Sequence, residues 1–352
     1  MQLIPNWNNV KPLGRTWPRE DGLWLAFSAT GAEFAFSGNV CTVVFAGDHR
    51  AADANEDCNH ARVAIEVDGV HLADTMIDAA EKTVTVEAGE GEHIARILKL
   101  SETAMSTCGI KSIEAENIRP TEKKSRFIEF IGDSITCGYG MDDEVAEHHF
   151  VTGTEDASRA YAYRAAQELD ADYSLVSISG YGIISGYTAT AEAPITAQLL
   201  PDYYEKLGFS YGVFDGEVPQ DVRWDFSVRQ PDLIVINLGT NDDSYCLDHV
   251  ERQQHYSDEY VNFLKVVRRI NPGAKILCTL GIMGDRLYPW VEKAAAVYTD
   301  KTGDSNIACM PFVPQLLEDG YTADYHPTAV THGKAAAKIA AEIRLLLGWK
   351  IN

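Results

Sequence analysis

The pattern of the sequence changes near residue 126, and this change constrains the fold more than any other feature. Up to about residue 118 the chain shows short β-branched or alternating runs of strand length, separated by Gly and Asp turns. Many short strands with such turns indicate a sandwich or jelly roll. After residue 126, apolar runs of strand length alternate with helical segments. This alternation indicates a parallel sheet with right-handed crossovers.

We therefore expect two domains, which the length of 352 residues also favours. The first is an all-β jelly-roll or sandwich domain over residues 1–118, with strands at 32–37, 40–45, 62–67, 83–86 and 93–100. The polar segment 119–125 contains Pro120 and lacks periodicity, which is typical of a linker. Residues 126–352 are expected to form an α/β domain with a doubly wound parallel sheet. Its strands are predicted at 126–131, 173–179, 233–238, 275–280 and 306–313, and its helices at about 156–169, 258–270, 286–302 and 333–347.

The composition excludes several classes of protein. Hydrophobic residues make up 45% of the chain and charged residues 23%, as in globular proteins. The net charge of −22, without a basic patch, argues against nucleic-acid partners and against anionic membrane surfaces. No apolar run approaches the ~18 residues that a membrane span requires.

The cysteines and the N-terminus predict the compartment. The seven cysteines are scattered and form no C-x-x-C pair, so they fit neither a disulfide framework nor a zinc site. We expect most of them to be small core residues, and we expect no metal. The N-terminus lacks the basic start and apolar core of a signal peptide. We therefore expect a cytoplasmic protein; the alternative is a secreted protein whose signal has been removed.

Polar or Gly-containing motifs follow the first three predicted strands of the second domain, and a fourth precedes its last helix. The motifs are Gly132-Asp133-Ser134, Ser179-Gly180, Gly239-Thr240-Asn241-Asp242 and Asp324-Tyr325-His326-Pro327. In open α/β sheets, ligands bind at the carboxyl ends of the strands. We therefore expect the four motifs to converge on that edge.

The residues of these motifs supply the parts of an acyl-transfer site. A serine hydroxyl such as that of Ser134 becomes a nucleophile when a base takes its proton, and the imidazole of His326 is the candidate base. A tetrahedral oxyanion needs fixed donors, and the N–H groups of Ser134 and Gly180 and the side-chain amide of Asn241 are suitable. Each motif alone is commonly a turn or a cap, so the prediction depends on their combination.

The four motifs resemble the blocks of the SGNH (GDSL-type) hydrolases, over about residues 126–352. The β domain in front, Cys137-Gly138-Tyr139-Gly140 and Trp224-Asp225-Phe226-Ser227 make the chain look like carbohydrate esterase family 2, which pairs a jelly roll with a flavodoxin-like SGNH domain. The resemblance implies deacetylation of acetylated xylan, xylo-oligosaccharides or related sugars, without a cofactor. It also implies that Ser134 is the nucleophile, that His326 is the base, and that Ser134, Gly180 and Asn241 are the oxyanion donors.

One residue departs from the usual SGNH pattern. That pattern places an orienting Asp three residues before the His, where this chain has Ala323, whereas Asp324 lies two residues before it. A shift of one residue can turn a side chain to the other face of an extended segment. Two alternatives follow: Asp324 orients His326 as the third catalytic residue, or a backbone carbonyl does so in a Ser–His dyad.

Aromatic side chains are candidates for sugar contacts. The long stretch between residues 185 and 230 is rich in them, and long insertions near strand ends often shape a substrate site. The individual candidates are Tyr325, Tyr139, Trp224 and Trp290. Each of these rings could instead pack in the core.

The leading interpretation is a serine esterase that acts on an acetylated carbohydrate. An SGNH lipase or thioesterase acting on other short acyl esters is the alternative among enzymes, and it would need an apolar acyl tunnel. From a different class, the chain could be a carbohydrate-binding protein with a lapsed site, against which the intact Ser134, Asn241 and His326 argue. The first domain could wall the cleft, bind sugar or form a homo-oligomer.

Overall fold

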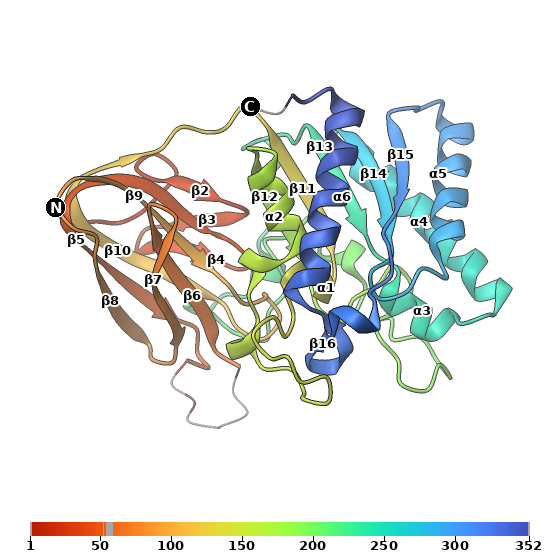
Figure 1. Ribbon diagram of the computed structural model, residues 1–352, viewed down its shortest axis with the longest axis horizontal. Helices are drawn as coiled ribbons and strands as arrows, with labels where there is room; N and C mark the ends of the chain where they lie inside the picture. The colour runs from red at the N-terminus through yellow and green to blue at the C-terminus, as the bar shows by residue number, and fades with distance from the viewer. Residues whose placement is uncertain (1, 52, 54–58, 351–352) are drawn as a thin grey trace.

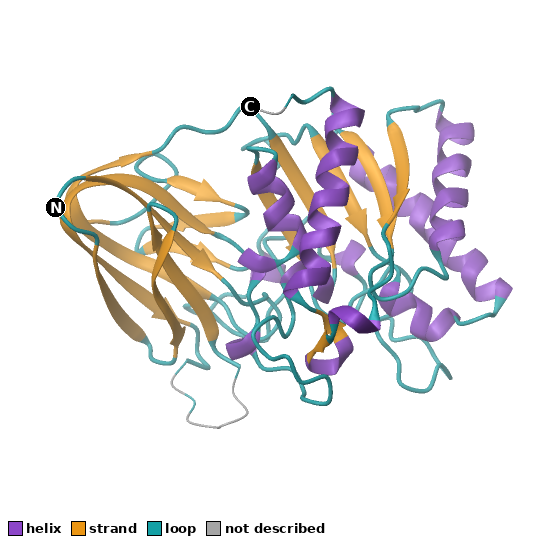
Figure 2. Ribbon diagram, in the orientation of Figure 1, coloured by secondary structure: helices purple, strands orange, loops and turns teal. Residues whose placement is uncertain are grey.

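Two sheets of different kinds organise the computed structural model of the protein, which describes residues 2–51, 53 and 59–350. An antiparallel sheet fills the N-terminal half, and a parallel sheet with helices on both faces fills the C-terminal half (Figures 1 and 2). The two halves lie side by side. This is the predicted all-β domain followed by an α/β domain with a doubly wound sheet, and the fold prediction is confirmed.

Strand β5 (Gly31–Gly47) is the central strand of the N-terminal sheet. The prediction of two separate strands, 32–37 and 40–45, was wrong because β5 continues through Gly38 (φ 86°) and exchanges one antiparallel partner for another there. Its side chains alternate, and the rings of Phe34, Phe36 and Phe45 are buried. The other strands are β1 (Gln2–Leu3), β2 (Lys11–Leu13), β3 (Thr16–Arg19), β4 (Gly22–Leu25), β6 (Ala61–Val67), β7 (Val70–Ile77), β8 (Glu81–Glu87), β9 (Glu92–Lys99) and β10 (Cys108–Pro120).

The parallel sheet has the strand order β12-β11-β13-β14-β15. Its strands are β11 (Phe127–Gly132), β12 (Asp172–Ser177), β13 (Leu233–Asn237), β14 (Lys275–Leu280) and β15 (Ile307–Pro311). This is the flavodoxin-like order, in which the direction of winding reverses beside the first strand. Helices α2 (Tyr161–Glu168) and α6 (Ala329–Leu347) cover one face, and α4 (Val250–Ile270) and α5 (Tyr288–Thr302) cover the other (Figure 2).

Shorter elements lie in the segments that connect the strands and helices of this half. They are α1 (Ser134–Cys137), η1 (Thr152–Thr154), η2 (Ala157–Arg159), η3 (Leu200–Asp202), η4 (Pro219–Asp221), α3 (Thr240–Cys246), η5 (Leu317–Asp319), β16 (Tyr321–Thr322), η6 (Ala323–Tyr325) and β17 (His326–Pro327). Helix α3 was not predicted. Helix α6 begins four residues earlier than predicted because Thr328 caps it, its hydroxyl accepting the N–H of Thr331.

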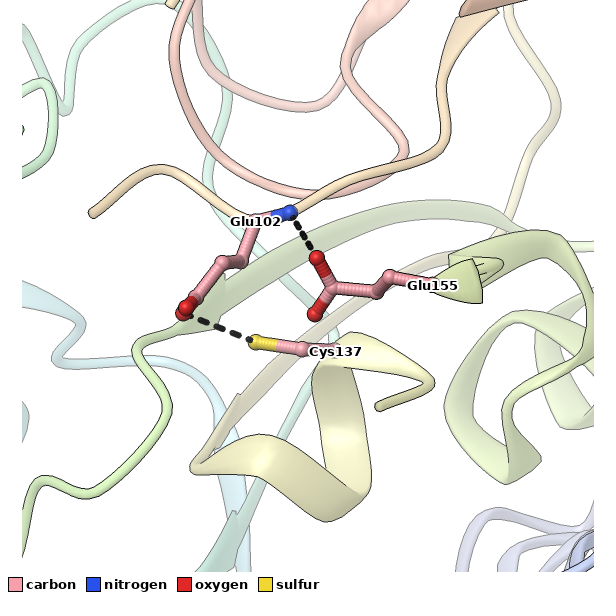
Figure 3. Close-up of side chains that lie close together, drawn as sticks. All are labelled: Glu102, Cys137 and Glu155. Atoms are coloured by element: carbon pink, nitrogen blue, oxygen red, sulfur yellow. Dashed lines mark hydrogen bonds between the residues drawn. The ribbon is translucent and has the colours of Figure 1, made fainter. Parts of the chain in front are cut away.

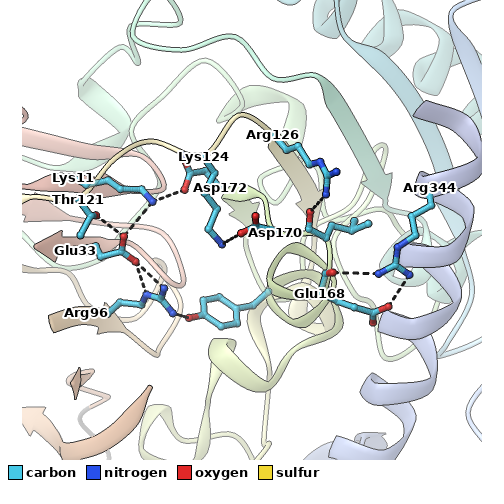
Figure 4. A network of polar contacts seen from close by, with 12 residues as sticks. Lys11, Glu33, Arg96, Thr121, Lys124, Arg126, Glu168, Asp170, Asp172 and Arg344 are labelled. Carbon is cyan, nitrogen blue, oxygen red and sulfur yellow. Dashed lines mark hydrogen bonds and ion pairs between the residues drawn. The ribbon is translucent and has the colours of Figure 1, made fainter. Parts of the chain in front are cut away.

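Polar contacts join the two halves. Arg119 and Pro120, which we placed in the linker, are the last residues of β10, so the connection between the sheets spans residues 121–126. Lys11 contacts Asp172 at the start of β12 (2.7 Å) and Glu33 of β5 (3.2 Å) (Figure 4). From the insertion between residues 185 and 230, Phe214 stacks on Trp24 of β4 with ring centroids 5.4 Å apart. The insertion therefore helps to hold the two halves together.

Five of the described cysteines are buried and Cys309 is partly buried, as expected of core residues, whereas Cys58 lies outside the described residues. Among the helices that the structure describes, none combines the length and the apolar character needed to cross a bilayer.

Candidate active site

Ser134 is the first residue of helix α1, immediately after strand β11. The carboxylate of Asp133 caps this helix by accepting the N–H of Ile135 (3.1 Å). A Cβ atom at Gly132 would lie 2.1 Å from the hydroxyl oxygen of Thr136, so the turn requires glycine there. The strand and the capped helix thus fix the backbone that carries Ser134, whose exposed fraction is 6%.

His326 faces Ser134 from strand β17. Its Nε2 lies 2.9 Å from Ser134 Oγ, and its Nδ1 lies 3.2 Å from the carbonyl oxygens of both Ala323 and Asp324. Carbonyl oxygens only accept hydrogen bonds, so they place the imidazole proton on Nδ1 and leave Nε2 to accept the proton of Ser134. Burial lowers the pKa of His326 to about 4, although the two carbonyls oppose this shift. The imidazole is therefore neutral at neutral pH, as a general base must be.

The carboxylate of Asp324 points away from His326. It accepts the hydroxyl of Tyr139 (2.6 Å) and the N–H of Phe150 (3.0 Å), and it lies 2.8 Å from Nδ1 of His149. The backbone of Asp324 is left-handed (φ 51°, ψ 36°), and this turn directs its carbonyl at His326. The geometry is that of the backbone-carbonyl alternative, because the Asp324 side chain holds the turn and its main chain contacts the imidazole.

The three candidate oxyanion donors lie at the carboxyl ends of adjacent strands. Gly132 pairs with Ser177 of β12 and with Asn237 of β13, so the loops that carry Ser134, Gly180 and Asn241 begin side by side. In the part of the chain that the structure describes, the N–H groups of Ser134 and Gly180 have no acceptor. The side-chain amide of Asn241 donates to the carbonyl of Tyr181 (2.9 Å) and contacts Asp133 (3.3 Å). The structure therefore brings the predicted donors to one edge.

Asp242 supports the loop that follows Gly180, a role that the sequence did not reveal. Its buried carboxylate accepts the N–H groups of Ile183 (2.9 Å), Ile184 (2.7 Å) and Ser185 (3.1 Å). Burial raises the pKa of Asp242 to about 6, and the three backbone donors oppose that shift. Its place as the fourth residue of the Gly239-Thr240-Asn241-Asp242 motif could have indicated this role. A carboxylate that is buried beside a candidate oxyanion donor needs hydrogen-bond donors of its own.

Of the four candidate sugar-contacting rings, Tyr325 and Tyr139 lie beside His326, and the two tryptophans lie elsewhere. Tyr325 is beside His326 and 54% exposed, so it remains a candidate. Tyr139 stacks on the imidazole of His326 (centroids 3.8 Å apart, planes at 17°), so its ring supports the histidine.

The structure does not bring the two tryptophans to Ser134. Trp224 precedes β13 and packs against Trp7 (6.2 Å) beside Phe127, at the amino edge of the parallel sheet. Trp290 lies on α5, with its ring beneath the ammonium of Lys293 (4.4 Å) and its carbonyl bonded to Ser257 of α4. Trp224 lies at the amino end of the sheet because it precedes a strand, whereas Trp290 lies in the first turn of α5 and contacts α4.

Other aromatic rings lie beside the loop that carries Ser179 and Gly180 after β12, which we call the oxyanion loop. Tyr181 contacts Tyr203 (5.7 Å) and Phe209 (5.8 Å), and Phe209 contacts Tyr211 (5.0 Å). Tyr211 is 55% exposed. The insertion therefore adds an aromatic surface next to Gly180, as its composition predicted only in general terms.

Buried groups that could ligate a metal lie behind the site. Glu102, Cys137 and Glu155 bring ligand-type atoms within 4.8 Å of one another (Figure 3). The sequence did not predict this cluster, because its members come from three distant segments.

Comparisons with known proteins agree with the arrangement of the two halves. Residues 130–334 match the GDSL-like Lipase/Acylhydrolase family, and residues 13–123 match the family described as Carbohydrate esterase 2 N-terminal. The chain is 31% identical to Cellulase/esterase CelE of Acetivibrio thermocellus over 91% of its own length, but it spans only 38% of that protein. It is 26% identical to an "Acetylxylan esterase / glucomannan deacetylase" of Cellvibrio japonicus, over 97% of this chain and 90% of that one.

Solved structures show the same two-part architecture. A family two carbohydrate esterase from Clostridium thermocellum, in complex with cellohexaose, superposes with a TM-score of 0.82 and 28% identity, over 97% of this chain and all of that one. An acetyl xylan esterase from Butyrivibrio proteoclasticus has a TM-score of 0.88 at 24% identity, over 99% of each chain, and this likeness bears on the fold alone.

Proposed function

The chain belongs to the GDSL-like lipase/acylhydrolase family and carries a carbohydrate esterase 2 N-terminal domain, and from this premise we propose that it is a serine esterase. It removes acetyl groups from acetylated xylan, xylo-oligosaccharides or related sugars. The observation that carries the proposal is the 2.9 Å contact between Ser134 Oγ and His326 Nε2, in an imidazole whose other nitrogen is already held. Cytoplasmic location and homo-oligomer formation stay predictions from the sequence.

The chemistry is acyl transfer in two steps. Neutral His326 takes the proton of Ser134 Oγ as that oxygen attacks the acetyl carbonyl carbon. The carbonyl oxygen becomes an oxyanion, which the N–H groups of Ser134 and Gly180 and the amide of Asn241 stabilise. When the intermediate collapses, His326 gives its proton to the departing sugar oxygen and leaves an acetyl ester on Ser134. A water molecule, deprotonated by His326, then releases acetate by the same route.

The surroundings of Ser134 favour a sugar ester over a lipid. Exposed tyrosines, Tyr325 beside His326 and Tyr211 beyond the oxyanion loop, offer rings on which a sugar can stack and hydroxyls that can bond to it. The net charge of −22 disfavours polyanionic substrates and leaves neutral carbohydrate acceptable. The lipase or thioesterase alternative would need an apolar tunnel.

The test is hydrolysis of p-nitrophenyl esters from acetate to octanoate, by wild type and by Ser134→Ala. We expect wild type to hydrolyse acetate fastest, to release acetate from acetylated xylo-oligosaccharides, and to lose both activities in Ser134→Ala. A rate that rises toward octanoate would refute the deacetylase proposal. The absence of hydrolysis by a folded wild-type protein would refute any esterase and favour the carbohydrate-binding alternative.

Asp324→Asn should lower kcat only a few-fold. The imidazole is held by main-chain carbonyls that the substitution leaves in place. Asn also tolerates left-handed backbone and retains an oxygen that can accept the hydroxyl of Tyr139. Initial rates with p-nitrophenyl acetate decide the matter, because loss of a true orienting Asp costs about 10⁴-fold in kcat.

The acid limb of the pH profile should lie well below pH 6.5. Catalysis requires neutral His326, and burial lowers its pKa from 6.5 to about 4. The imidazole therefore stays neutral as the pH falls through 6.5, and it is lost as a base only when the pH approaches that lowered pKa. The measurement is kcat/KM against pH, which reports the free enzyme, with circular dichroism to exclude unfolding. A fall of kcat/KM to half its maximum near pH 6.5, in protein that is still folded, would contradict the lowered pKa of His326.

A further inference from the structure

Glu102 belongs to the N-terminal half, yet it reaches the oxyanion loop. It lies between β9 and β10, and none of its surface is exposed. Its Oε2 accepts the N–H of Ser179, the residue directly before Gly180 (2.8 Å). The same oxygen lies 3.9 Å from Sγ of Cys137, the last residue of the helix that Ser134 begins. One carboxylate thus contacts both segments that carry the backbone oxyanion donors.

The segment that carries Glu102 is itself held firmly. The N–H of Glu102 donates to Oε2 of Glu155 (2.6 Å) (Figure 3). The carbonyl of Glu102 accepts from the buried ammonium of Lys99 (2.5 Å). The hydroxyl of Thr103 donates to the carbonyl of Phe209 in the insertion (2.9 Å). These bonds fix the position of the Glu102 backbone relative to the oxyanion loop.

Burial disfavours the ionised form of both carboxyl groups in this cluster. Burial raises the pKa of Glu102 and that of Glu155, and the nearby Glu102 carboxylate raises the pKa of Glu155 further. The ammonium of Lys99 beside them opposes these shifts, while burial lowers the pKa of Lys99 itself. The contact with Ser179 does not depend on this balance, because a carboxyl oxygen can accept the N–H of Ser179 in either protonation state.

We propose that Glu102 is a positioning residue through which the N-terminal domain aligns the oxyanion loop with the helix that carries Ser134. The proposal rests on the esterase function proposed above. It gives the N-terminal domain a direct part in catalysis: without the contact at Ser179, the N–H of Gly180 is free to leave the position that the oxyanion needs.

The test compares two variants of similar volume in the full chain. Glu102→Gln keeps an oxygen that can accept the N–H of Ser179, whereas Glu102→Met removes the acceptor and fills the space with an apolar group that a buried site tolerates. Full loss of one oxyanion donor costs about 10²–10³-fold in kcat, so we expect about 10–100-fold for Glu102→Met, with KM for p-nitrophenyl acetate little changed. Glu102→Gln should stay within a few-fold of wild type.

A tetrahedral inhibitor separates this role from a merely structural one. An alkyl boronic acid forms an adduct on a serine hydroxyl, and one of its oxygens then occupies the oxyanion hole. We expect its Ki to rise in Glu102→Met by about the same factor as kcat falls, and to change little in Glu102→Gln. Equal kcat in wild type and both variants would overturn the proposal, as would equal losses in both variants.

Three further outcomes are distinguishable. A stoichiometric metal ion that elemental analysis finds in wild type and not in Glu102→Met would overturn the proposal, because Glu102 would then be a metal ligand. If wild type itself hydrolyses no ester, the proposed function fails together with this inference. If wild type is active and Glu102→Met equals it, only this inference fails.

Discussion

His326→Ala should lower kcat for p-nitrophenyl acetate by about 10⁴–10⁶-fold, as removal of the base does in other serine hydrolases. Nε2 of His326 is the atom placed to take the proton of Ser134 Oγ, at 2.9 Å. Without it, the hydroxyl must lose its proton to water, for which its pKa is far too high. The KM should change little, because the ring contacts the nucleophile rather than the sugar.

The control is His255→Ala, on the exposed side of helix α4. Its kcat should equal that of wild type, which would show that replacing a histidine outside the site does not lower the activity. Added imidazole should restore part of the activity of His326→Ala, because a small base can enter the vacated space. A loss below tenfold in folded His326→Ala would show that another group takes the proton.

Arg15→Met should lower the free energy of unfolding by about 3–5 kcal/mol, the usual consequence of removing one partner of a buried ion pair. Arg15 is 1% exposed, and its guanidinium lies 3.0 Å from the carboxylate of Glu129, in the middle of β11. It also donates to the carbonyls of Tyr204 (2.5 Å) and Lys206 (3.1 Å). The variant leaves Glu129 charged and buried, and it removes a bond between the two halves of the molecule.

Urea unfolding followed by circular dichroism measures this loss. Lys111→Met is the matched control, because Lys111 forms an ion pair with Glu81 in which both partners are exposed, and such a pair contributes at most ~1 kcal/mol. Adding Glu129→Gln to Arg15→Met should recover part of the stability, since the unpaired charge is removed. A loss in Arg15→Met no larger than in the control would mean that the ion pair does not hold the halves together.

Patterns local in sequence predicted the architecture well. Strand β14 begins and ends where the apolar run 275–280 predicted, and the five parallel strands all appear within a few residues of their predicted bounds. The motifs at their ends meet because parallel strands in register bring their carboxyl ends to one edge. Periodicity and turn residues are enough to predict where strands and helices lie, because each of these elements depends mainly on the residues of its own segment.

Contacts between distant segments could not be predicted in this way. The single-residue shift before His326 was visible, but only the left-handed turn at Asp324 decides that a carbonyl meets the imidazole. Tyr139 looked like a sugar-contacting ring because a sequence does not show which face a ring covers. Glu102 carried no signal, since its partner Ser179 lies 77 residues away.

The most direct test of the account is labelling with a fluorophosphonate, whose phosphorus is attacked by an activated serine oxygen with loss of fluoride. Peptide mapping should find one phosphonyl group per chain, on Ser134. His326→Ala should react far more slowly, Ser134→Ala should not react at that peptide, and Asp324→Asn should be labelled at nearly the wild-type rate. Labelling at another residue, or equal rates in wild type and His326→Ala, would contradict the assignment of Ser134 and His326 as nucleophile and base.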